Sequence, residues 1–424
     1  MKTRIQSILI VIILLFPGLL IKLQAVNPAP DGCYPNFTTA EGCNALSLLT
    51  TGAANTGLGW RSLFSDTAGS YNTAIGAGAL ALNNGDSNAA VGAAALLLNT
   101  SGTENVAVGT GALLFNGTGA DNTAVGAFAL FQSTTGFNTA IGDRTLFSDT
   151  TGHSNVAVGF AGCCGAALFS NTTGSFNTAV GGGALSSNTE GGDNTAIGAG
   201  ALEDNIEGNE NVAVGLNALN NSTGDNNVAL GNYAGFSATN GSNNIYIGYQ
   251  IEGTAGESNA CYIGSIFGQT AAGGSAVFID ANGKLGTMTS SKRFKEEIKP
   301  MNKGSEALFS LKPVAFRYKK EIDPSGKSQL GLVAEEVEKV NPDLVVRDKE
   351  GKPNSVRYDQ VNAMLLNEFL KEHNAFAEEQ RKVEQQQQEI DLLKAELKQQ
   401  RALIQRVNNK VELKASASQV VINK

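Results

Sequence analysis

A short motif, Asn-x-Ala-(Ile/Val/Leu)-Gly, places polar and apolar residues in a fixed order and recurs through the middle of the chain. Successive copies begin 16 or 17 residues apart, except for one step of 22 residues between Asn155 and Asn177. Each copy has the length of a strand, and glycine recurs too often for a helix. The copies, of which the first and last are weaker, open at Asn55, Asn72, Asn88, Asn105, Asn122, Asn138, Asn155, Asn177, Asn194, Asn211, Asn227 and Asn244.

The rest of each repeat predicts turns and a shared core. A leucine usually follows the motif glycine by four residues, and a second glycine usually precedes the next asparagine by three, among turn-forming residues. One such unit cannot bury its apolar face alone, whereas stacked units can, so the period predicts a parallel β-solenoid over residues 55–264. We expect the alanines to pack closely, the branched residues to supply core and the asparagines to form hydrogen-bonded ladders.

The longest step between two repeats predicts an inserted loop. In the copy that opens at Asn155 the leucine appears five residues late, at Leu168, after the sequence Gly162-Cys163-Cys164-Gly165. The periodicity on both sides is unchanged, so we expect the five extra residues to bulge out of one coil.

The last part of the chain has a heptad period. Apolar residues recur every seven positions, which predicts a coiled coil over residues 372–413, followed by a tail, 414–424. The companion heptad position is mixed, with Leu365 and Leu393 but also Glu372 and Gln386, so the seam is weak for two helices alone. The regular apolar positions are Phe369, Phe376, Val383, Ile390, Leu397, Ile404 and Val411.

The first residues have the arrangement of a signal peptide. Lys2 and Arg4 precede an almost wholly apolar stretch, residues 8–21, and small-residue cleavage fits after Ala25. We expect Met1–Ala25 to direct export, with an uncleaved membrane anchor as the alternative. Residues 26–54 then form an N-terminal cap segment before the repeats.

Composition separates the chain into two unlike parts. Residues 26–285 hold 44 of the 50 glycines, 18 acidic residues and 3 basic ones, whereas the residues after them hold 25 basic and 21 acidic ones. The contrast excludes one homogeneous domain. It also argues against a nucleic-acid partner, because the large segment has almost no cations for phosphates.

The cysteines and histidines offer little further chemistry. In an exported protein Cys33 and Cys43 could close a small loop through a disulfide. The chain has only two histidines and no aspartate at a fixed place in the repeats, so we expect no zinc or calcium site, no other metal and no cofactor.

The repeats resemble the head repeats of trimeric autotransporter adhesins. The match rests on the pentapeptide from Asn55 onward, although the repeat here is slightly longer and the adhesins' C-terminal membrane anchor is absent. The resemblance implies a mainly β fold: a left-handed parallel β-roll in which three chains associate along one axis.

The segment 290–371, after a connector at residues 265–289, resembles the intramolecular chaperone auto-processing domain of phage endosialidases and tail spikes. In that serine peptidase family the domain trimerises a β-structured fibre and cuts itself off before its first serine. The motifs are Ser-x-x-Arg-x-Lys from Ser290, Lys-Pro-Val-x-Phe from Lys312, Gly-x-Val-Ala-Glu-Glu-Val from Gly331, Asn341-Pro342 and Val-x-Tyr from Val356.

The second resemblance implies a serine–lysine dyad and one cleavage in cis. Ser290 would be the nucleophile, Lys295 the general base and Thr289–Ser290 the scissile bond. The family often has Asp after its serine, where this chain has Ser291, so Ser291 is a rival nucleophile; the five-residue spacing favours Ser290. A trimerisation domain that never cleaves is the plainer alternative.

Together these features predict an exported homotrimeric fibre or adhesin-like surface protein, with a host-surface or polysaccharide ligand. One alternative is a phage-tail-like polysaccharide-degrading enzyme with a groove on the shaft, and another is an uncleaved structural spacer. The densest acidic cluster is Glu203, Asp204, Glu207 and Glu210, for which a solvated turn is the simpler explanation.

Overall fold

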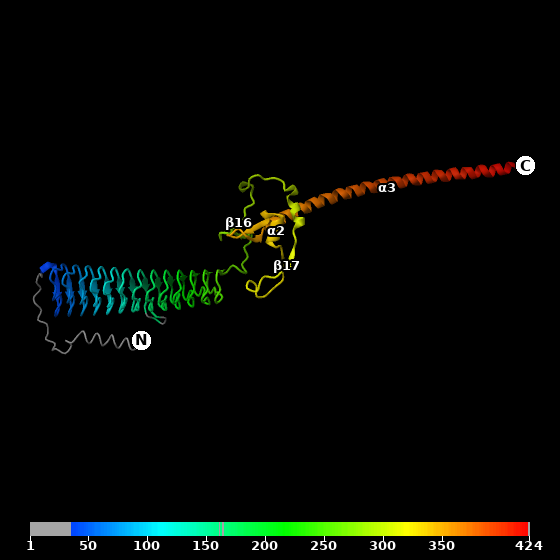
Figure 1. Ribbon diagram of the computed structural model, residues 1–424. Coiled ribbons are helices and arrows are strands. Elements are labelled where there is room, and N and C mark those ends of the chain that lie inside the picture. Colours follow the sequence, from blue (N-terminus) through cyan, green and yellow to red (C-terminus); the bar gives the residue numbers. More distant parts are fainter. Residues whose placement is uncertain (1–34, 161, 163–164, 423–424) are drawn as a thin grey trace. The chain divides into compact units, whose positions relative to one another are not determined.

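The computed structural model describes residues 35–160, 162 and 165–422, with side chains described as far as residue 414 (Figure 1). These residues form two compact units that divide between Thr270 and Ala271. The predicted signal peptide lies outside the described residues, and so does Cys33.

The first unit is a parallel β-solenoid, as the repeats predict, and a single 3-10 turn, η1 (Pro35–Phe37), precedes it. Fourteen strands of three residues pair in chain order, and equivalent residues of neighbouring coils lie in register (Figure 1). The ladder includes one coil before Asn55, where Thr38 stands in the place of asparagine. The strands are β1 (Thr39–Glu41), β2 (Thr56–Leu58), β3 (Thr73–Ile75), β4 (Ala89–Val91), β5 (Val106–Val108), β6 (Thr123–Val125), β7 (Thr139–Ile141), β8 (Val156–Val158), β9 (Thr178–Val180), β10 (Thr195–Ile197), β11 (Val212–Val214), β12 (Val228–Leu230), β13 (Ile245–Ile247) and β14 (Cys261–Ile263).

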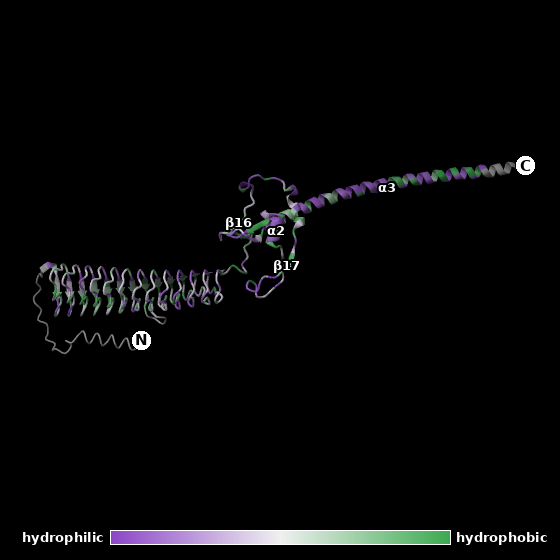
Figure 2. Cartoon of the chain, in the orientation of Figure 1, coloured by the Kyte–Doolittle hydropathy of each residue, from purple (hydrophilic) through white to green (hydrophobic). Residues whose placement is uncertain are grey.

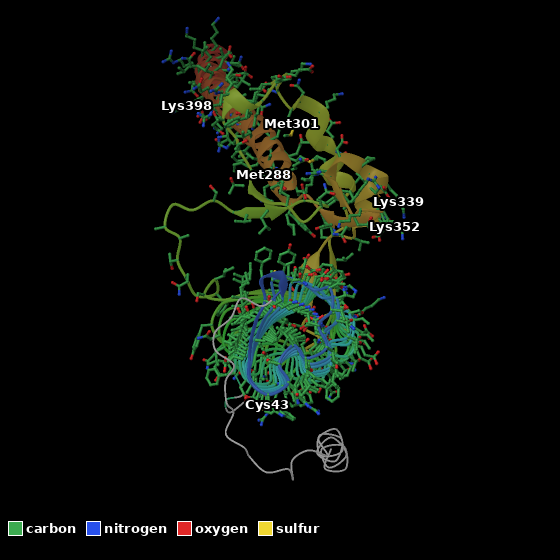
Figure 3. All side chains as sticks on the ribbon, turned by 90° about the vertical axis from the view of Figure 1, so that its left-hand side faces the viewer. Cys43, Met288, Met301, Lys339, Lys352 and Lys398 are labelled. Atoms are coloured by element: carbon green, nitrogen blue, oxygen red, sulfur yellow. The ribbon has the colours of Figure 1, made fainter. Side chains whose placement is uncertain are left out.

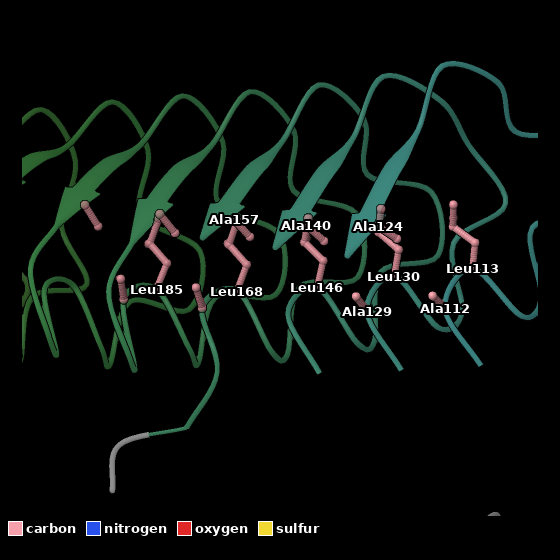
Figure 4. Packing of buried hydrophobic residues seen from close by; sticks show 14 of the residues in the cluster. Ala112, Leu113, Ala124, Ala129, Leu130, Ala140, Leu146, Ala157, Leu168 and Leu185 are labelled. Carbon is pink, nitrogen blue, oxygen red and sulfur yellow. The ribbon is translucent and has the colours of Figure 1, made fainter. Parts of the chain in front are cut away.

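The core of the solenoid consists mainly of alanine and leucine. The middle residue of each strand from β3 to β12 is a fully buried alanine, and the leucine that follows the motif glycine packs beside it. Figure 4 shows this alternation for Ala124, Leu130, Ala140 and Leu146. The inserted residues after Phe160 leave the packing intact, since β8 pairs with β9 in the same register.

The branched residues do not supply the core of the single chain, so that part of the sequence-based prediction is wrong. Successive strand residues point to opposite faces, and the buried alanine places its neighbours outside. Ile75, Val91 and Ile197 are 38%, 38% and 42% exposed. The outward residues of β3–β14 form a surface that we call the strand face. Its third-position column is Ile75, Val91, Val108, Val125, Ile141, Val158, Val180, Ile197, Val214, Leu230, Ile247 and Ile263.

The predicted asparagine ladder is confirmed. The side-chain oxygen of Asn105 accepts a hydrogen bond from the backbone N–H of Asn122 at 3.0 Å, and its Nδ2 donates to the carbonyl of Gly119 at 2.8 Å. A second buried column, three residues after the core leucine, was not predicted. In it Asn116 Nδ2 donates to Asn99 Oδ1 at 2.9 Å, and Asn99 Nδ2 donates to Asn83 Oδ1 at 2.7 Å.

Two aspartates replace asparagine in this second column. Asp149 is fully buried and accepts hydrogen bonds from Ser133 Oγ and Asn171 Nδ2, both at 3.0 Å. Burial raises the pKa of Asp149 to about 7, against these hydrogen bonds, which lower it. Burial likewise raises the pKa of Asp66 to about 6. A carboxylate therefore fits this column less well than the amide that most coils place there.

The second unit contains short strands and turns around one small core. Its elements in chain order are β15 (Val277–Ile279), β16 (Leu285–Thr287), η2 (Lys292–Phe294), η3 (Asn302–Ser310), β17 (Val314–Phe316), β18 (Gln329–Gly331), α2 (Ala334–Val340), η4 (Pro342–Leu344), β19 (Val345–Arg347), β20 (Pro353–Val356) and α3 (Tyr358–Ile422). The strands pair as three antiparallel hairpins. The buried core comprises Val337, Leu344, Val345, Val356, Val361 and Met364.

The helix α3 extends 65 residues, and most of it lies beyond this core. It is largely hydrophilic, with hydrophobic residues at intervals (Figure 2). The predicted heptad residues are exposed on the single chain; Phe369 and Ile404, for example, are 64% and 60% exposed. Across the described ranges, no helix combines the length and the apolar character that crossing a membrane requires.

Candidate functional site

The segment before the candidate site is a tight hairpin. Strands β15 and β16 pair through a turn in which Asp280 Oδ1 accepts hydrogen bonds from the N–H groups of Asn282, at 2.9 Å, and Lys284, at 3.0 Å. Gly283 adopts a φ of 83°, which suits glycine in the turn. Strand β16 ends at Thr287, and Met288 follows it, so the hairpin delimits the segment that holds the predicted scissile bond (Figure 3).

A single 3-10 turn brings the two predicted site residues together. Ser291 is extended, η2 spans Lys292–Phe294, and Lys295 is extended again. The N–H of Phe294 donates to the carbonyl of Ser291 at 3.0 Å, so the chain reverses within this turn. As a result Lys295 Nζ lies 3.1 Å from Ser290 Oγ, which is hydrogen-bonding distance.

The cationic side chains near Ser290 and Lys295 contact different groups. The guanidinium of Arg293 lies 4.6 Å from the centre of the Phe294 ring. Lys299 Nζ forms an ion pair with Glu297 at 3.3 Å, which neutralises part of the positive charge that the sequence places here. No hydrogen bond between Ser291 and Lys295 side chains is seen among the described contacts, whereas the Ser290 contact is present. The side-chain contact thus joins Lys295 to Ser290, and the choice of Ser290 rather than Ser291 as nucleophile stays a prediction.

Ser290 and Lys295 are both exposed in the single chain. A serine hydroxyl becomes an effective nucleophile when a neighbouring base takes its proton. A lysine amine can act as that base after it has lost its own proton, which burial or nearby cations favour. In the single chain, Ser290 Oγ and Lys295 Nζ are within hydrogen-bonding distance, but neither side chain is buried.

A polar network that sequence reasoning missed ties the segment after the dyad to α3. The buried hydroxyl of Ser305, in η3, accepts a hydrogen bond from Asn367 Nδ2 at 2.6 Å and donates one to Glu368 Oε1. Lys371 Nζ pairs with the same carboxylate at 2.7 Å. Hydrogen bonds from Lys371 and Ser305 lower the pKa of Glu368. The Glu-x-x-Lys spacing on the helix was the available signal, but its partner in η3 is more than sixty residues away.

The remaining candidates belong to the first unit. Cys43 is exposed in the first coil (Figure 3), and because Cys33 is outside the described residues their disulfide stays a prediction. In the acidic cluster, Glu203 accepts a hydrogen bond from Asn220 at 3.0 Å, while Asp204, Glu207 and Glu210 are exposed. Within the part of the chain that the structure describes, no three His, Cys, Asp or Glu side chains gather closely enough to hold a metal ion.

Comparison with known proteins identifies the segment that contains Ser290 and Lys295. Residues 290–346 match the family model described as chaperone of endosialidase, and the match begins at Ser290. This segment is therefore a chaperone-of-endosialidase domain, downstream of a parallel β-solenoid, as the resemblance predicted. No curated protein and no solved structure matches the chain.

Proposed function

We propose that the chain is an exported, trimeric, adhesin-like fibre protein whose C-terminal domain trimerises the shaft and cleaves it once, between Thr289 and Ser290. The observation that carries the proposal is the 3.1 Å contact between Lys295 Nζ and Ser290 Oγ at the first residue of the matched domain. The predicted signal peptide supports export, and the resemblance of the repeats supports a fibre with a surface ligand.

Exposed apolar side chains in the second unit support association of several copies. Leu330 and Phe309 are 86% and 74% exposed, and only six residues form the buried core. The heptad residues of α3 are also exposed, and a lone amphipathic helix buries nothing until it meets a partner. A second or third copy is the partner that both surfaces share.

The strand face supports association along the shaft as well. Its outward first and third residues in β3–β14 include no charged side chain, although residues 26–285 carry 21 charged residues. A continuous uncharged column of branched side chains over twelve coils exceeds what a monomer normally exposes. Burial of this face between copies gives the branched column the core role that it lacks in one chain.

The proposed cleavage has two stages, attack by the Ser290 hydroxyl and hydrolysis of the resulting ester. Ser290 Oγ attacks the carbonyl carbon of Thr289 while neutral Lys295 accepts the hydroxyl proton. The C–N bond breaks, the proton passes from Lys295 to the departing amine of Ser290, and an ester joins Thr289 to the Ser290 side chain. Water then hydrolyses the ester, which leaves a carboxylate at Thr289 and a free amino group at Ser290.

Burial by another copy completes the site in this scheme. The dyad is exposed in one chain, and desolvation favours the neutral amine that the first step requires. Cleavage then occurs after assembly and not directly after translation, so only assembled chains are cut.

Expression of residues 26–424 beside three variants tests the proposal. On a denaturing gel the unchanged chain should give two fragments, about two-thirds and one-third of its length, whereas Ser290→Ala and Lys295→Ala should remain intact. Ser291→Ala is the matched control and should cleave normally, because the rival hydroxyl has no role. The new amino terminus should begin with Ser290.

Two results would contradict the proposal. An unchanged chain that forms a trimer in sedimentation yet stays intact would remove the cleavage and leave a structural spacer. A monomer by sedimentation, for both the full chain and Ser290→Ala, would remove the fibre. Cleavage retained in Ser290→Ala but lost in Ser291→Ala would transfer the nucleophile to the neighbouring serine.

A further inference from the structure

Four aromatic side chains occupy a position of the coil where they gain little from folding. One of them, Phe37, precedes Thr38 in the first coil, has a φ of 59° and is 93% exposed. Tyr71, Phe137 and Phe176 each precede a ladder asparagine, and their φ values are 62°, 64° and 60°. They are 69%, 66% and 56% exposed. A left-handed backbone costs an L-residue about 1–2 kcal/mol, least for Asn and Asp, and an exposed ring recovers little of it. The other coils place small or polar residues here, namely Ala54, Ser87, Glu104, Asp121, Ser154, Asp193, Glu210, Asn226, Asn243 and Asn259.

These rings belong to one aligned column on the shaft, in two pairs whose members are two coils apart: Phe37 with Tyr71, and Phe137 with Phe176. Carboxylates occupy the adjoining coils only beside the second pair. The N–H of Phe137 donates to the carbonyl of Ala120 at 3.0 Å, and the N–H of Phe176 donates to that of His153 at 3.1 Å. The same bond is made by the N–H groups of Glu104, Asp121, Asp193 and Glu210, so the residues at this position stack along the solenoid axis. Neighbouring coils are about 4.8 Å apart, which separates Phe137 from Phe176, two coils on, by roughly 10 Å.

Polar groups complete the column. We define the aromatic edge as Glu104, Asp121, Phe137, His153, Ser154, Phe176, Asp193 and Glu210. The His153 ring packs edge-on against Phe176, with ring centres 4.9 Å apart, and its Nδ1 lies 3.3 Å from Ser154 Oγ. Two exposed carboxylates stand on each side of the ring pair. The order along the axis is acid, acid, ring, hydroxyl, ring, acid, acid.

The shape and charge of the aromatic edge select a narrow, uncharged ligand. One column of side chains is too small for a stable protein interface, which buries about 800 Å² per partner. Residues 26–285 carry 18 acidic and 3 basic residues, so an anionic polymer is repelled. Sugars present C–H groups to the negative face of a phenyl ring and hydroxyl donors to carboxylates. The two-coil spacing is also close to the disaccharide repeat of an extended β-linked glycan.

We propose that the aromatic edge binds a linear, neutral, β-linked polysaccharide that lies along the shaft axis. The rings of Phe137 and Phe176 stack on alternate sugars, and the flanking carboxylates accept hydrogen bonds from sugar hydroxyls. The inference deepens the proposed surface-attachment function, on which its biological role rests. Binding itself needs neither cleavage nor release of the shaft.

The test uses the uncleaved Ser290→Ala chain, so the result is independent of autoprocessing. Titration calorimetry with β-1,4-linked glucose and N-acetylglucosamine hexamers should detect binding of at least one hexamer. Adding Phe137→Ser and Phe176→Ser should weaken that binding at least tenfold. Serine already occupies this position in two other coils, at Ser87 and Ser154, so the double variant should fold and melt like its parent.

Tyr71→Ser is the matched control. Tyr71 has the same backbone conformation and exposure, but the neighbouring coils carry Ala54 and Ser87 at this position instead of carboxylates. Its affinity for the hexamer should stay within twofold of the parent. Absence of binding to both hexamers, equal binding by the double variant, or preferential binding of an anionic hyaluronan oligosaccharide would each overturn the proposal, whatever the outcome of the cleavage test.

Discussion

The solenoid and the C-terminal unit differ in how much apolar surface a single chain buries. Thirty-two buried apolar residues form one continuous core in the solenoid, and two asparagine columns satisfy the backbone at its turns. The C-terminal unit buries six apolar residues and exposes large apolar side chains along α3 and the hairpins. Each coil of the solenoid is therefore covered by the coils beside it, whereas the C-terminal unit leaves apolar side chains uncovered in one chain.

The difference assigns a separate task to each region. A repeat structure propagates once neighbouring coils have formed, but the contacts within and between its coils do not set the number of chains that associate. In the proposed assembly, the exposed heptad residues of α3 can bring copies of the chain together before the long strand face is buried. Substitutions in the solenoid should therefore change its stability, whereas substitutions in α3 should change the association of copies.

The most disruptive change should be Gly126→Ala. Gly126 has a φ of 140°, and an added Cβ would lie 2.4 Å from the carbonyl oxygen of Gly142 in the next coil. Backbone cannot yield there as a flexible side chain can, so we expect a loss of about 5 kcal/mol or more. Gly117→Ala is the control, because no atom lies within 4 Å of its added Cβ. Equal denaturation midpoints for the two variants would contradict the close approach of the coils.

Asp149→Asn should stabilise the solenoid at neutral and alkaline pH. The pKa of Asp149 is raised to about 7, so the folded chain holds a proton that the unfolded chain has lost, and stability falls as pH rises from about 4 to 7. The variant should gain about 4 kcal/mol at pH 8 and almost nothing at pH 4. Asp204→Asn, on an exposed turn, should change neither value. Urea denaturation at both pH values measures the effect, and a gain that is independent of pH would contradict it.

Ile390→Asp should weaken association of the C-terminal unit without harming the solenoid. Burying an isoleucine is worth about 2–3 kcal/mol, and an aspartate at that heptad position opposes burial further. Gln388→Asp introduces the same residue on the opposite face of α3 and should leave the oligomer unchanged. Sedimentation equilibrium separates the two, and an unchanged oligomer in both variants would show that the heptad is not the seam.

The smallest effect should come from Ser222→Asn. Ser222 interrupts the second asparagine column, and both its hydroxyl and Asn205 Oδ1 are buried without a hydrogen-bond partner within the described structure. An asparagine can donate to Asn205 as its counterparts do in other coils, which should add about 1 kcal/mol. Thr223→Asn, which introduces the same residue at the exposed neighbouring position, should not stabilise the chain. A lower denaturation midpoint for Ser222→Asn would contradict the expected new hydrogen bond to Asn205.

The periodicity of the sequence was sufficient for the architecture. Repeats of 16 or 17 residues, with alanine, glycine and asparagine at set places, allow a parallel solenoid with one asparagine ladder, and the structure has both. The five-residue separation of Ser290 and Lys295 also matched the reach of one 3-10 turn. These features depend on neighbours in sequence or in the next coil, so local chemistry determines them.

Other features required the tertiary structure. The sequence identifies Val125 as apolar, but only the inward direction of Ala124 decides that Val125 faces outward. Asp149 looks like an ordinary turn aspartate until the coil encloses it, and Ser305 meets Glu368 across more than sixty residues. Sequence period thus determined which coils form and how they stack. Side-chain direction and long-range packing decided what is buried, what is charged and which surfaces are left for partners, because burial depends on every coil that surrounds a residue.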